Sequence, residues 1–165
     1  ADLLDGFSTT NGNFLTWVVE TLDMIIEILK AEQLTDEIQL QVTDLYRQLN
    51  SEVEQRPLSE VLNANNNVLV TVCKENENIL GIALLSTYKV ISGYRALVED
   101  VVVNTAQRGK GIGRKLMEKL LEEAKAMGVD EVLLFTGHHR KPAIGLYTSL
   151  GFELRRSGIY NKKLT

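Results

Sequence analysis

A glycine-rich segment with three positive side chains is the part of this sequence best suited to chemistry. Gly109, Gly111 and Gly113 stand between three consecutive valines and an apolar periodic stretch. Glycine lets the backbone adopt positive φ and lets an anion approach the main chain without meeting a Cβ atom. The free N–H groups and the positive dipole end of a following helix would bind phosphate or pyrophosphate. The added positive charges are those of Arg108, Lys110 and Arg114.

The residues on either side of this segment predict a strand, a loop and a helix. Val101, Val102 and Val103 are β-branched and apolar, which favours an extended and buried run. Residues 112–127 carry apolar side chains at spacings of three and four, which predicts one amphipathic helix. Because Ile112 opens that helix, the loop directs its amides outward from a helix N-terminus.

Two common phosphate-binding motifs do not fit the segment. A nucleoside-triphosphate loop requires G-x-x-x-x-G-K-[ST], and no Ser or Thr follows Lys110. A dinucleotide fingerprint requires G-x-G-x-x-G, whereas Leu116 occupies the third glycine position after Gly111. A glycine-rich turn between strand and helix can also be purely structural, so a second motif is needed to assign a function.

A third pattern fits, and a downstream motif agrees with it. The run from Gln107 to Gly113 resembles the [QR]-x-x-G-x-[GA] loop with which the GCN5-related N-acetyltransferase (GNAT) family binds acetyl-coenzyme A. The run from Ala143 to Phe152 resembles the family's A-x-x-[LF]-Y-x-x-x-G-F segment, at about the family's distance from the loop. The resemblance covers roughly residues 24–165 and implies an N-acetyltransferase domain there, with residues 1–23 as an N-terminal extension.

The resemblance implies a transferase that moves the acetyl group of acetyl-coenzyme A to a primary amine by direct attack, without a metal ion. The pyrophosphate would lie against the loop from Arg108 to Arg114. A bulge near the end of the preceding strand would direct a backbone N–H of residues 101–103 at the thioester carbonyl. Tyr147 would protonate the departing thiolate, although a packed helix aromatic explains it too.

Two neighbouring acids are the candidates for a general base. A base is useful because an alkyl ammonium is almost entirely protonated at neutral pH. Glu99 and Asp100 occupy the strand where the family often carries an acid that acts through water. On a regular strand their side chains point to opposite faces, so only one can face the acceptor. We favour Glu99, with a structural salt bridge as the alternative.

The segment before Ala143 departs from the family pattern. Members often carry Asn three residues before this alanine, and Arg140 stands there. Arg140 or Lys141 could instead contact phosphate or an acidic acceptor. The adjacent His138 and His139 predict a solvated loop rather than a metal site, because two neighbouring histidines alone are a poor ligand set.

The length and composition of the chain are typical of one soluble domain. The 165 residues include 44% hydrophobic and 24% charged residues. A net charge of −4 argues against nucleic acid as the main partner. The one cysteine, Cys73, rules out an internal disulfide and fits a reducing cytoplasmic location. The most apolar stretch, residues 14–29, contains three acidic residues, so we expect no membrane span.

The periodicity of the chain predicts an α/β (α+β) fold, in which helices flank a mixed, mostly antiparallel sheet with one parallel pair at the ligand. The pattern of residues 13–29 fits one helix, but the end of this segment also fits a strand. The family resemblance favours a helix to about Leu22 and then a strand at 24–30. Further strands are expected at 68–74, 79–87, 94–103 and 131–136. Further helices are expected to begin near Thr35, Pro57 and Pro142. A final hairpin is expected from strands at 152–156 and 159–164.

An amine of a small molecule or of a peptide is the expected acceptor. The run Glu99-Asp100-Val-Val-Val resembles the glucosamine-phosphate acetyltransferases, which keeps an amino sugar open. The acidic net charge suits a small cationic amine or a basic peptide end. The alternative function is a non-catalytic coenzyme A binding or regulatory domain. An apolar helix within residues 1–23 would cover a sheet edge or join a homodimer contact.

Overall fold

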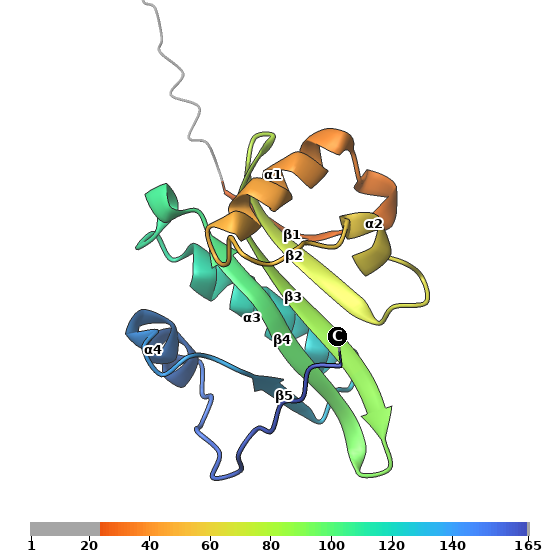
Figure 1. Ribbon diagram of the computed structural model, residues 1–165, viewed down its shortest axis with the longest axis vertical. Coiled ribbons are helices and arrows are strands. Elements are labelled where there is room, and N and C mark those ends of the chain that lie inside the picture. The colour runs from red at the N-terminus through yellow and green to blue at the C-terminus, as the bar shows by residue number, and fades with distance from the viewer. Residues whose placement is uncertain (1–23, 165) are drawn as a thin grey trace, which may run out of the picture.

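The fold is built on one sheet of five strands, and the computed structural model describes residues 24–164. The strands are β1 (Ile25–Leu29), β2 (Val68–Glu75), β3 (Asn78–Val90), β4 (Gly93–Val103) and β5 (Glu131–Leu134). They lie side by side in sequence order, with β1 to β4 antiparallel and β5 parallel to β4 (Figure 1). The predicted mixed, mostly antiparallel sheet with one parallel pair is therefore confirmed.

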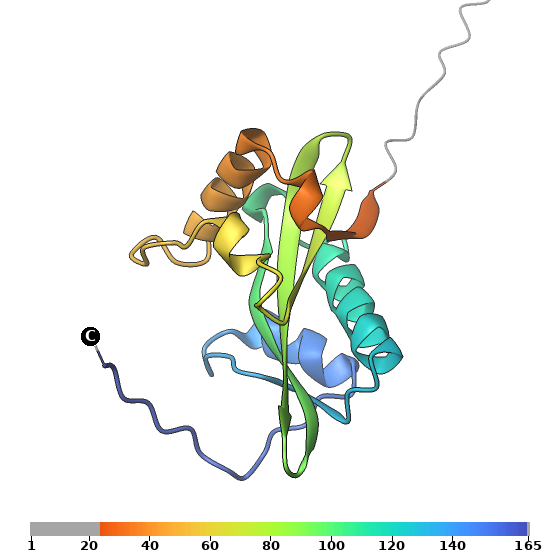
Figure 2. The same ribbon diagram turned by 90° about the vertical axis from the view of Figure 1, so that its right-hand side faces the viewer.

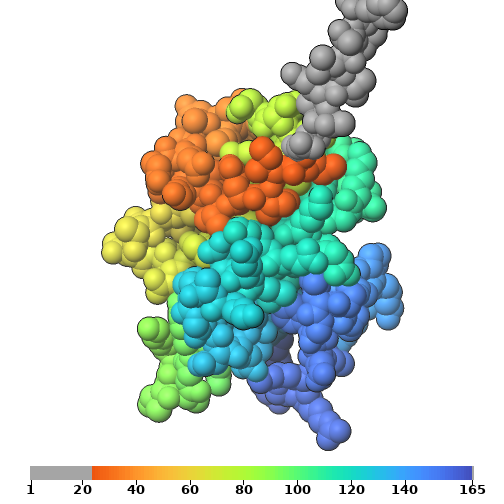
Figure 3. Space-filling model, turned by 180° about the vertical axis from the view of Figure 1, so that it is seen from behind, coloured from red at the N-terminus to blue at the C-terminus, as the bar shows by residue number. Residues whose placement is uncertain are grey.

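Helices cover both faces of this sheet. On one face lie α1 (Asp36–Arg47) and the short α2 (Leu58–Val61), and on the other lies α3 (Ile112–Ala126), as Figure 2 shows. Seen from behind, α3 crosses the middle of its face with α4 (Lys141–Ser149) beside it (Figure 3). Two short 3-10 turns, η1 (Ala31–Gln33) and η2 (Thr105–Gln107), precede α1 and α3. The chain thus forms three layers.

Each face of the sheet carries its own apolar core. The stripe of α3 that the sequence predicts is buried against one face, and its most buried members are Ile112, Leu116, Met117 and Leu120. Side chains of α1 and α2 fill the other face, and these are Val42, Leu45 and Leu58. Because both faces are covered, the central strands are apolar on both sides rather than alternating.

Local sequence signals set the ends of the main helices. The Thr35 side chain accepts a hydrogen bond from the Ile38 amide at 3.2 Å, so it is the N-cap of α1 as its position predicts. Beyond α3, Gly128 has a φ of 74°, a left-handed conformation in which glycine ends helices at little cost. Pro57 is the N-cap of α2, so this helix begins near Pro57 as expected.

The predicted C-terminal hairpin is wrong. Residues 152–164 form no strand, and Figure 2 shows this last segment leaving the body of the fold. Its apolar side chains Leu154, Ile159 and Tyr160 are exposed. A short alternating pattern forms a strand only beside an edge that buries one of its faces, and β5 offers four residues instead of the six expected. Arg155 ties the segment to Glu131 of β5.

The predicted helix ending near Leu22, and with it the N-terminal extension at residues 1–23, lie outside the described residues. The boundary at residue 24 stays a prediction. From Met24 onward the ambiguity between helix and strand is resolved, because β1 pairs with β2 from Ile25 to Leu29.

We expect the α3 core to carry much of the stability of the fold. Leu116→Ala removes a side chain with no exposed surface, so the lost burial and the cavity should lower the free energy of unfolding by about 3 kcal/mol. Urea denaturation followed by circular dichroism measures this change. Leu40→Ala, at a position of α1 that is 60% exposed, is the control and should cost less than about 1 kcal/mol. Similar losses in both variants would contradict this assignment of the core.

Candidate active site

Unpaired backbone amides are gathered where the chain leaves β4 and enters α3. Gly111 is the N-cap of α3 and has a φ of 78°. The first helical hydrogen bond runs from the Lys115 amide to the Gly111 carbonyl at 3.1 Å. Within the described chain the amides of Ile112, Gly113 and Arg114 donate to no acceptor. Since the first turn also lacks an acidic side chain, the dipole and the free N–H groups create a site for an anion.

The space in front of these amides is open. A Cβ atom added at Gly109 or at Gly111 would meet no other atom within 4 Å. Both residues have positive φ, so their glycines serve the backbone conformation and leave the amides accessible. Gly113 differs, because a Cβ atom there would lie 3.4 Å from the Leu146 side chain and 3.7 Å from that of Val103. This glycine lets α3 begin close to α4 and to the end of β4.

The three predicted cations surround the loop, each held by a neighbour. Arg108 Nε donates to the Val103 carbonyl at 3.3 Å, and Lys110 Nζ donates to the Gln107 side chain at 2.7 Å. Both partners are neutral, so neither positive charge is cancelled. Arg114 donates to Ser149 Oγ of α4 at 2.5 Å and forms a longer ion pair with Glu118 at 3.6 Å. The loop therefore presents a positive surface next to its free amides.

Strands β4 and β5 separate beside this loop. β5 pairs with β4 only from Arg95 to Val98, and its last residue, Leu134, lies opposite Val98. From Glu99 to Val103, no strand among residues 24–164 pairs with β4 on the side of β5. The predicted Val101, Val102 and Val103 lie on this free stretch, which runs directly into the anion site. An extended ligand with an anionic end can therefore lie along β4 while its anion meets the amides of α3.

A β-bulge interrupts β4 at the start of the free stretch. Ile82 pairs with Val102 and Leu84 pairs with Glu99, so two residues of β4 stand opposite Ala83. One of them is Asp100, which has a φ of 49°, a left-handed conformation that is uncommon outside glycine. The expectation of a bulge at this strand end is confirmed.

The bulge corrects our expectation that the two acids point to opposite faces. The partner of Glu99 is Leu84, which packs into the core beneath α1, so Glu99 also faces α1. The extra residue then turns the Asp100 side chain to the same face, where it lies beside the Tyr46 hydroxyl of α1. Both carboxylates therefore lie between β4 and α1, and the alternation rule fails because the strand is irregular here.

This cluster favours the neutral forms of its acids. Burial raises the pKa of the Asp100 carboxyl above its ordinary value, and the hydrogen bond from Tyr46 opposes part of the rise. Burial, followed by the charge of Asp100, also raises the pKa of Glu99. Burial and the same negative charge raise the pKa of the Tyr46 hydroxyl, which stays a donor. A carboxylate with a raised pKa is a stronger base, as proton abstraction from an amine requires.

Tyr147 lies on the face of the sheet that α3 covers, opposite the face that carries the two acids. Its ring is half-buried on α4, packs into the core beneath α3 and meets Phe152 edge to face at 6.1 Å between centroids. Burial raises the pKa of its hydroxyl, and the charge of Arg140 opposes this. Val101 and Val103 contact the same core. The structure thus places Tyr147 in the core on the α3 face, which Val101 and Val103 also contact, and the two acids on the α1 face.

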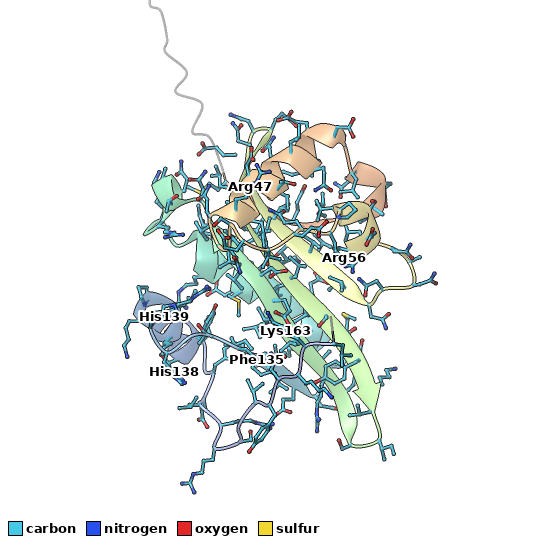
Figure 4. All side chains as sticks on the ribbon, in the orientation of Figure 1. Arg47, Arg56, Phe135, His138, His139 and Lys163 are labelled. Atoms are coloured by element: carbon cyan, nitrogen blue, oxygen red, sulfur yellow. The ribbon has the colours of Figure 1, made fainter. Side chains whose placement is uncertain are left out.

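The remaining polar candidates lie on the surface or are inert. His138 and His139 are exposed in the turn before α4, to which Arg140 is the N-cap residue (Figure 4). Among residues 24–164, no three His, Cys, Asp or Glu side chains are placed to hold a metal ion. Cys73 is buried, and its burial raises the pKa of the thiol, so it is poorly suited to act as a nucleophile.

Two functional candidates escaped the sequence analysis. Tyr46 reaches Asp100, and Gln48 accepts hydrogen bonds from the Thr105 amide at 2.9 Å and from the Thr105 hydroxyl at 2.8 Å. These bonds join the end of α1 to the η2 turn of the glycine loop. They link residues more than fifty positions apart, and no local pattern of one sequence indicates such pairs.

Relatives with known names match part of the chain. An L-methionine sulfoximine/L-methionine sulfone acetyltransferase of Salmonella typhimurium is 36% identical over 86 residues, 52% of this chain and 50% of that protein. The L-amino acid N-acyltransferase MnaT of Escherichia coli is 33% identical over 84 residues, 50% of this chain and 49% of that protein. The chain thus spans about half the length of the curated relatives it matches.

The fold and the family are also matched over most of the chain. A solved aminoglycoside N-acetyltransferase in complex with coenzyme A superposes with a TM-score of 0.69, covering 87% of this chain and 96% of that one. At 17% identity, this likeness shows the fold alone. No helix among the described residues has the length and apolar character needed to cross a bilayer.

The family model for the acetyltransferase (GNAT) family matches residues 24–152, which include the loop, the bulge and Tyr147. This chain belongs to the GNAT family of acetyltransferases.

Proposed function

We propose that this protein is an N-acetyltransferase that moves the acetyl group of acetyl-coenzyme A to the primary amine of a small molecule. The observation that carries this proposal is the free edge of β4, which leads from the bulge at Asp100 into the open amides of α3. Such an edge fits the extended amide-containing arm of coenzyme A, and the amides fit its pyrophosphate.

The residues present fit the two ends of this cosubstrate. Acetyl-coenzyme A supplies an activated thioester. The amides of residues 112–114, with Arg108 and Lys110 beside them, bind the pyrophosphate. A backbone N–H of residues 101–103, redirected by the bulge, donates to the thioester oxygen as negative charge develops on it. One such donor is worth about 3 kcal/mol at the barrier.

Proton transfers on the two sides of β4 complete the proposed mechanism. A new C–N bond forms while the C–S bond breaks, so the amine must lose a proton and the thiolate must gain one. Glu99 or Asp100, on the α1 face, accepts the amine proton directly or through water, and the raised pKa of each supports this role. Tyr147, on the other face, donates to the leaving sulfur, and the core that it shares with Val101 and Val103 of β4 supports this role.

An amino acid or a close analogue is the acceptor class that we propose. The support is the pair of relatives named for L-methionine sulfoximine, L-methionine sulfone and L-amino acids. An amino sugar stays the second choice. We further propose a reducing cytoplasmic setting, supported by the free thiol of Cys73. The expectations of a homodimer and of no nucleic-acid partner stay predictions.

The glycine loop predicts a change in coenzyme A affinity. Gly111→Ala forces a Cβ atom onto a residue with a φ of 78° and places it among the amides that meet the pyrophosphate. We expect the dissociation constant of coenzyme A, measured by calorimetry, to rise at least about tenfold. Gly128→Ala is the matched control, because its φ is 74° at the other end of α3. This variant should lose a similar amount of stability and keep its affinity for coenzyme A. An equal loss of affinity in both variants would contradict the assignment of the loop as the pyrophosphate site.

The role of Tyr147 predicts a loss of turnover with coenzyme A binding retained. Tyr147→Phe removes only the hydroxyl, so we expect kcat to fall by about a hundredfold, while calorimetry shows the dissociation constant of coenzyme A nearly unchanged. Tyr88→Phe, at an exposed position of β3, serves as the control. If wild-type protein binds coenzyme A but acetylates no amine, the non-catalytic alternative replaces this proposal.

The raised carboxyl pKa values predict the pH dependence of kcat/KM. Below the pKa of the amine, log kcat/KM falls by one per pH unit because the neutral amine becomes scarce. As the pH falls further, through the raised pKa of the base, the slope becomes two. The second break should vanish in Glu99→Gln or in Asp100→Asn, whichever carries the base. Its persistence in both variants would exclude these acids.

A further inference from the structure

An open cavity of about 470 Å³ lies between α1 and the loop that joins α1 to α2. Gln39, Thr43 and Arg47, spaced by four residues, form its wall on α1. Ser51 and residues 53–57, which include Arg56, form the facing wall. Seven of the nine lining residues are polar or charged, and the other two are Val53 and Pro57. Two of the three charged side chains are guanidinium groups, those of Arg47 and Arg56, which Figure 4 labels.

Hydrogen bonds hold the facing wall in place. Gln55 Nε2 donates to the Thr43 carbonyl at 3.0 Å, and the Leu58 amide donates to the Gln39 side chain at 2.7 Å. Leu58 is itself buried in the core beneath α1. The loop is therefore anchored to α1 at both of these points, and the cavity is a fixed feature of the fold.

Both arginines keep donors free for a ligand. Arg47 pairs with Asp44 at 2.8 Å and Arg56 pairs with Glu60 at 3.1 Å, in each case through one terminal nitrogen. These pairs are exposed, so they contribute little free energy and mainly orient the side chains. A guanidinium has five N–H donors, which leaves several for a planar anion. In the lining itself the two arginines face one carboxylate, that of Glu54, while Asp44 and Glu60, which pair with the arginines, are not among the lining residues.

The cavity begins next to the proposed reaction site. Arg47 stands between Tyr46, which reaches the Asp100 carboxylate, and Gln48, which bonds to Thr105 of the glycine loop. The last turn of α1 therefore touches the acids, the cavity and the loop. A small acceptor whose amine meets the acids on the α1 face can extend its other end toward Arg47.

We propose that this cavity binds the carboxylate of the amine acceptor, with Arg47 as the nearer donor and Arg56 as the farther one. The proposal rests on the proposed acetyl transfer and names the part of the acceptor that this chain recognises. Tyr46 and the two acids attract the amine end, while the two guanidinium groups attract the acid end. The charges of an amino acid match this arrangement, whereas its carboxamide keeps the amine and lacks the negative end.

The test compares L-methionine sulfone with its carboxamide as acceptors. The ratio of their kcat/KM values removes effects on acetyl-coenzyme A and on the acids, since these are shared. Arg47→Gln should lower this ratio about tenfold or more, because a charge-assisted pair to the carboxylate is lost. Arg56→Gln should lower it less. Lys125→Gln removes the same charge from an exposed site on α3, across the sheet, and should leave the ratio unchanged.

An unchanged ratio in both arginine variants would overturn the proposal while leaving acetyl transfer intact. If the wild-type protein acetylates neither compound, the proposed transfer fails, and calorimetry on coenzyme A-loaded protein decides about the cavity. Tighter binding of L-methionine sulfone by wild type than by Arg47→Gln supports the cavity as a carboxylate site. No binding, or equal binding by both proteins, overturns it.

Discussion

The bulge at Asp100 is the constraint on which the arrangement of the site depends. One extra residue in β4 moves Val101 and Val103 into the core beneath α3, and it leaves Glu99 and Asp100 together on the α1 face. It also coincides with the point where β5 stops pairing. Without the bulge, the side chains of β4 would alternate between the two faces as far as the end of the strand, and the sheet would separate the two acids. A non-glycine residue with positive φ costs free energy, which the surrounding strands must offset.

The anion site is a consequence of the same strand end. A helix N-terminus attracts anions wherever it is exposed, but its use depends on what lies beside it. Here Gly113 allows α3 to start against Val103 and Leu146, so the free amides continue the line of the open edge of β4. Gly113 thus allows close packing, while Gly109 and Gly111 leave the surface open. Together they produce a continuous surface from the anion site to the acids.

Much of the fold followed from local patterns, and the failures have physical causes. The glycine loop, α3 and the N-cap of α1 depend on nearby residues, so their periodicity and capping were sufficient. The side-chain directions of Glu99 and Asp100 were predicted wrongly, since a bulge depends on the partner strand. The final hairpin failed for a related reason, because pairing requires an edge that β5 is too short to provide. The cavity at Arg47 required a loop to fold back onto α1, which no spacing indicates.

The bond between Gln48 and Thr105 joins two binding surfaces that are otherwise separate. The end of α1 lies on the proposed acceptor side of the site, and η2 begins the loop that is proposed to face the anion. If either ligand shifts its own element, this connection transmits the strain to the other element. The resulting coupling free energy must be reciprocal: whatever acetyl-coenzyme A does to the affinity for the acceptor, the acceptor does to the affinity for acetyl-coenzyme A. The strength of this coupling, whichever substrate binds first, thus depends on a contact between two elements of the protein.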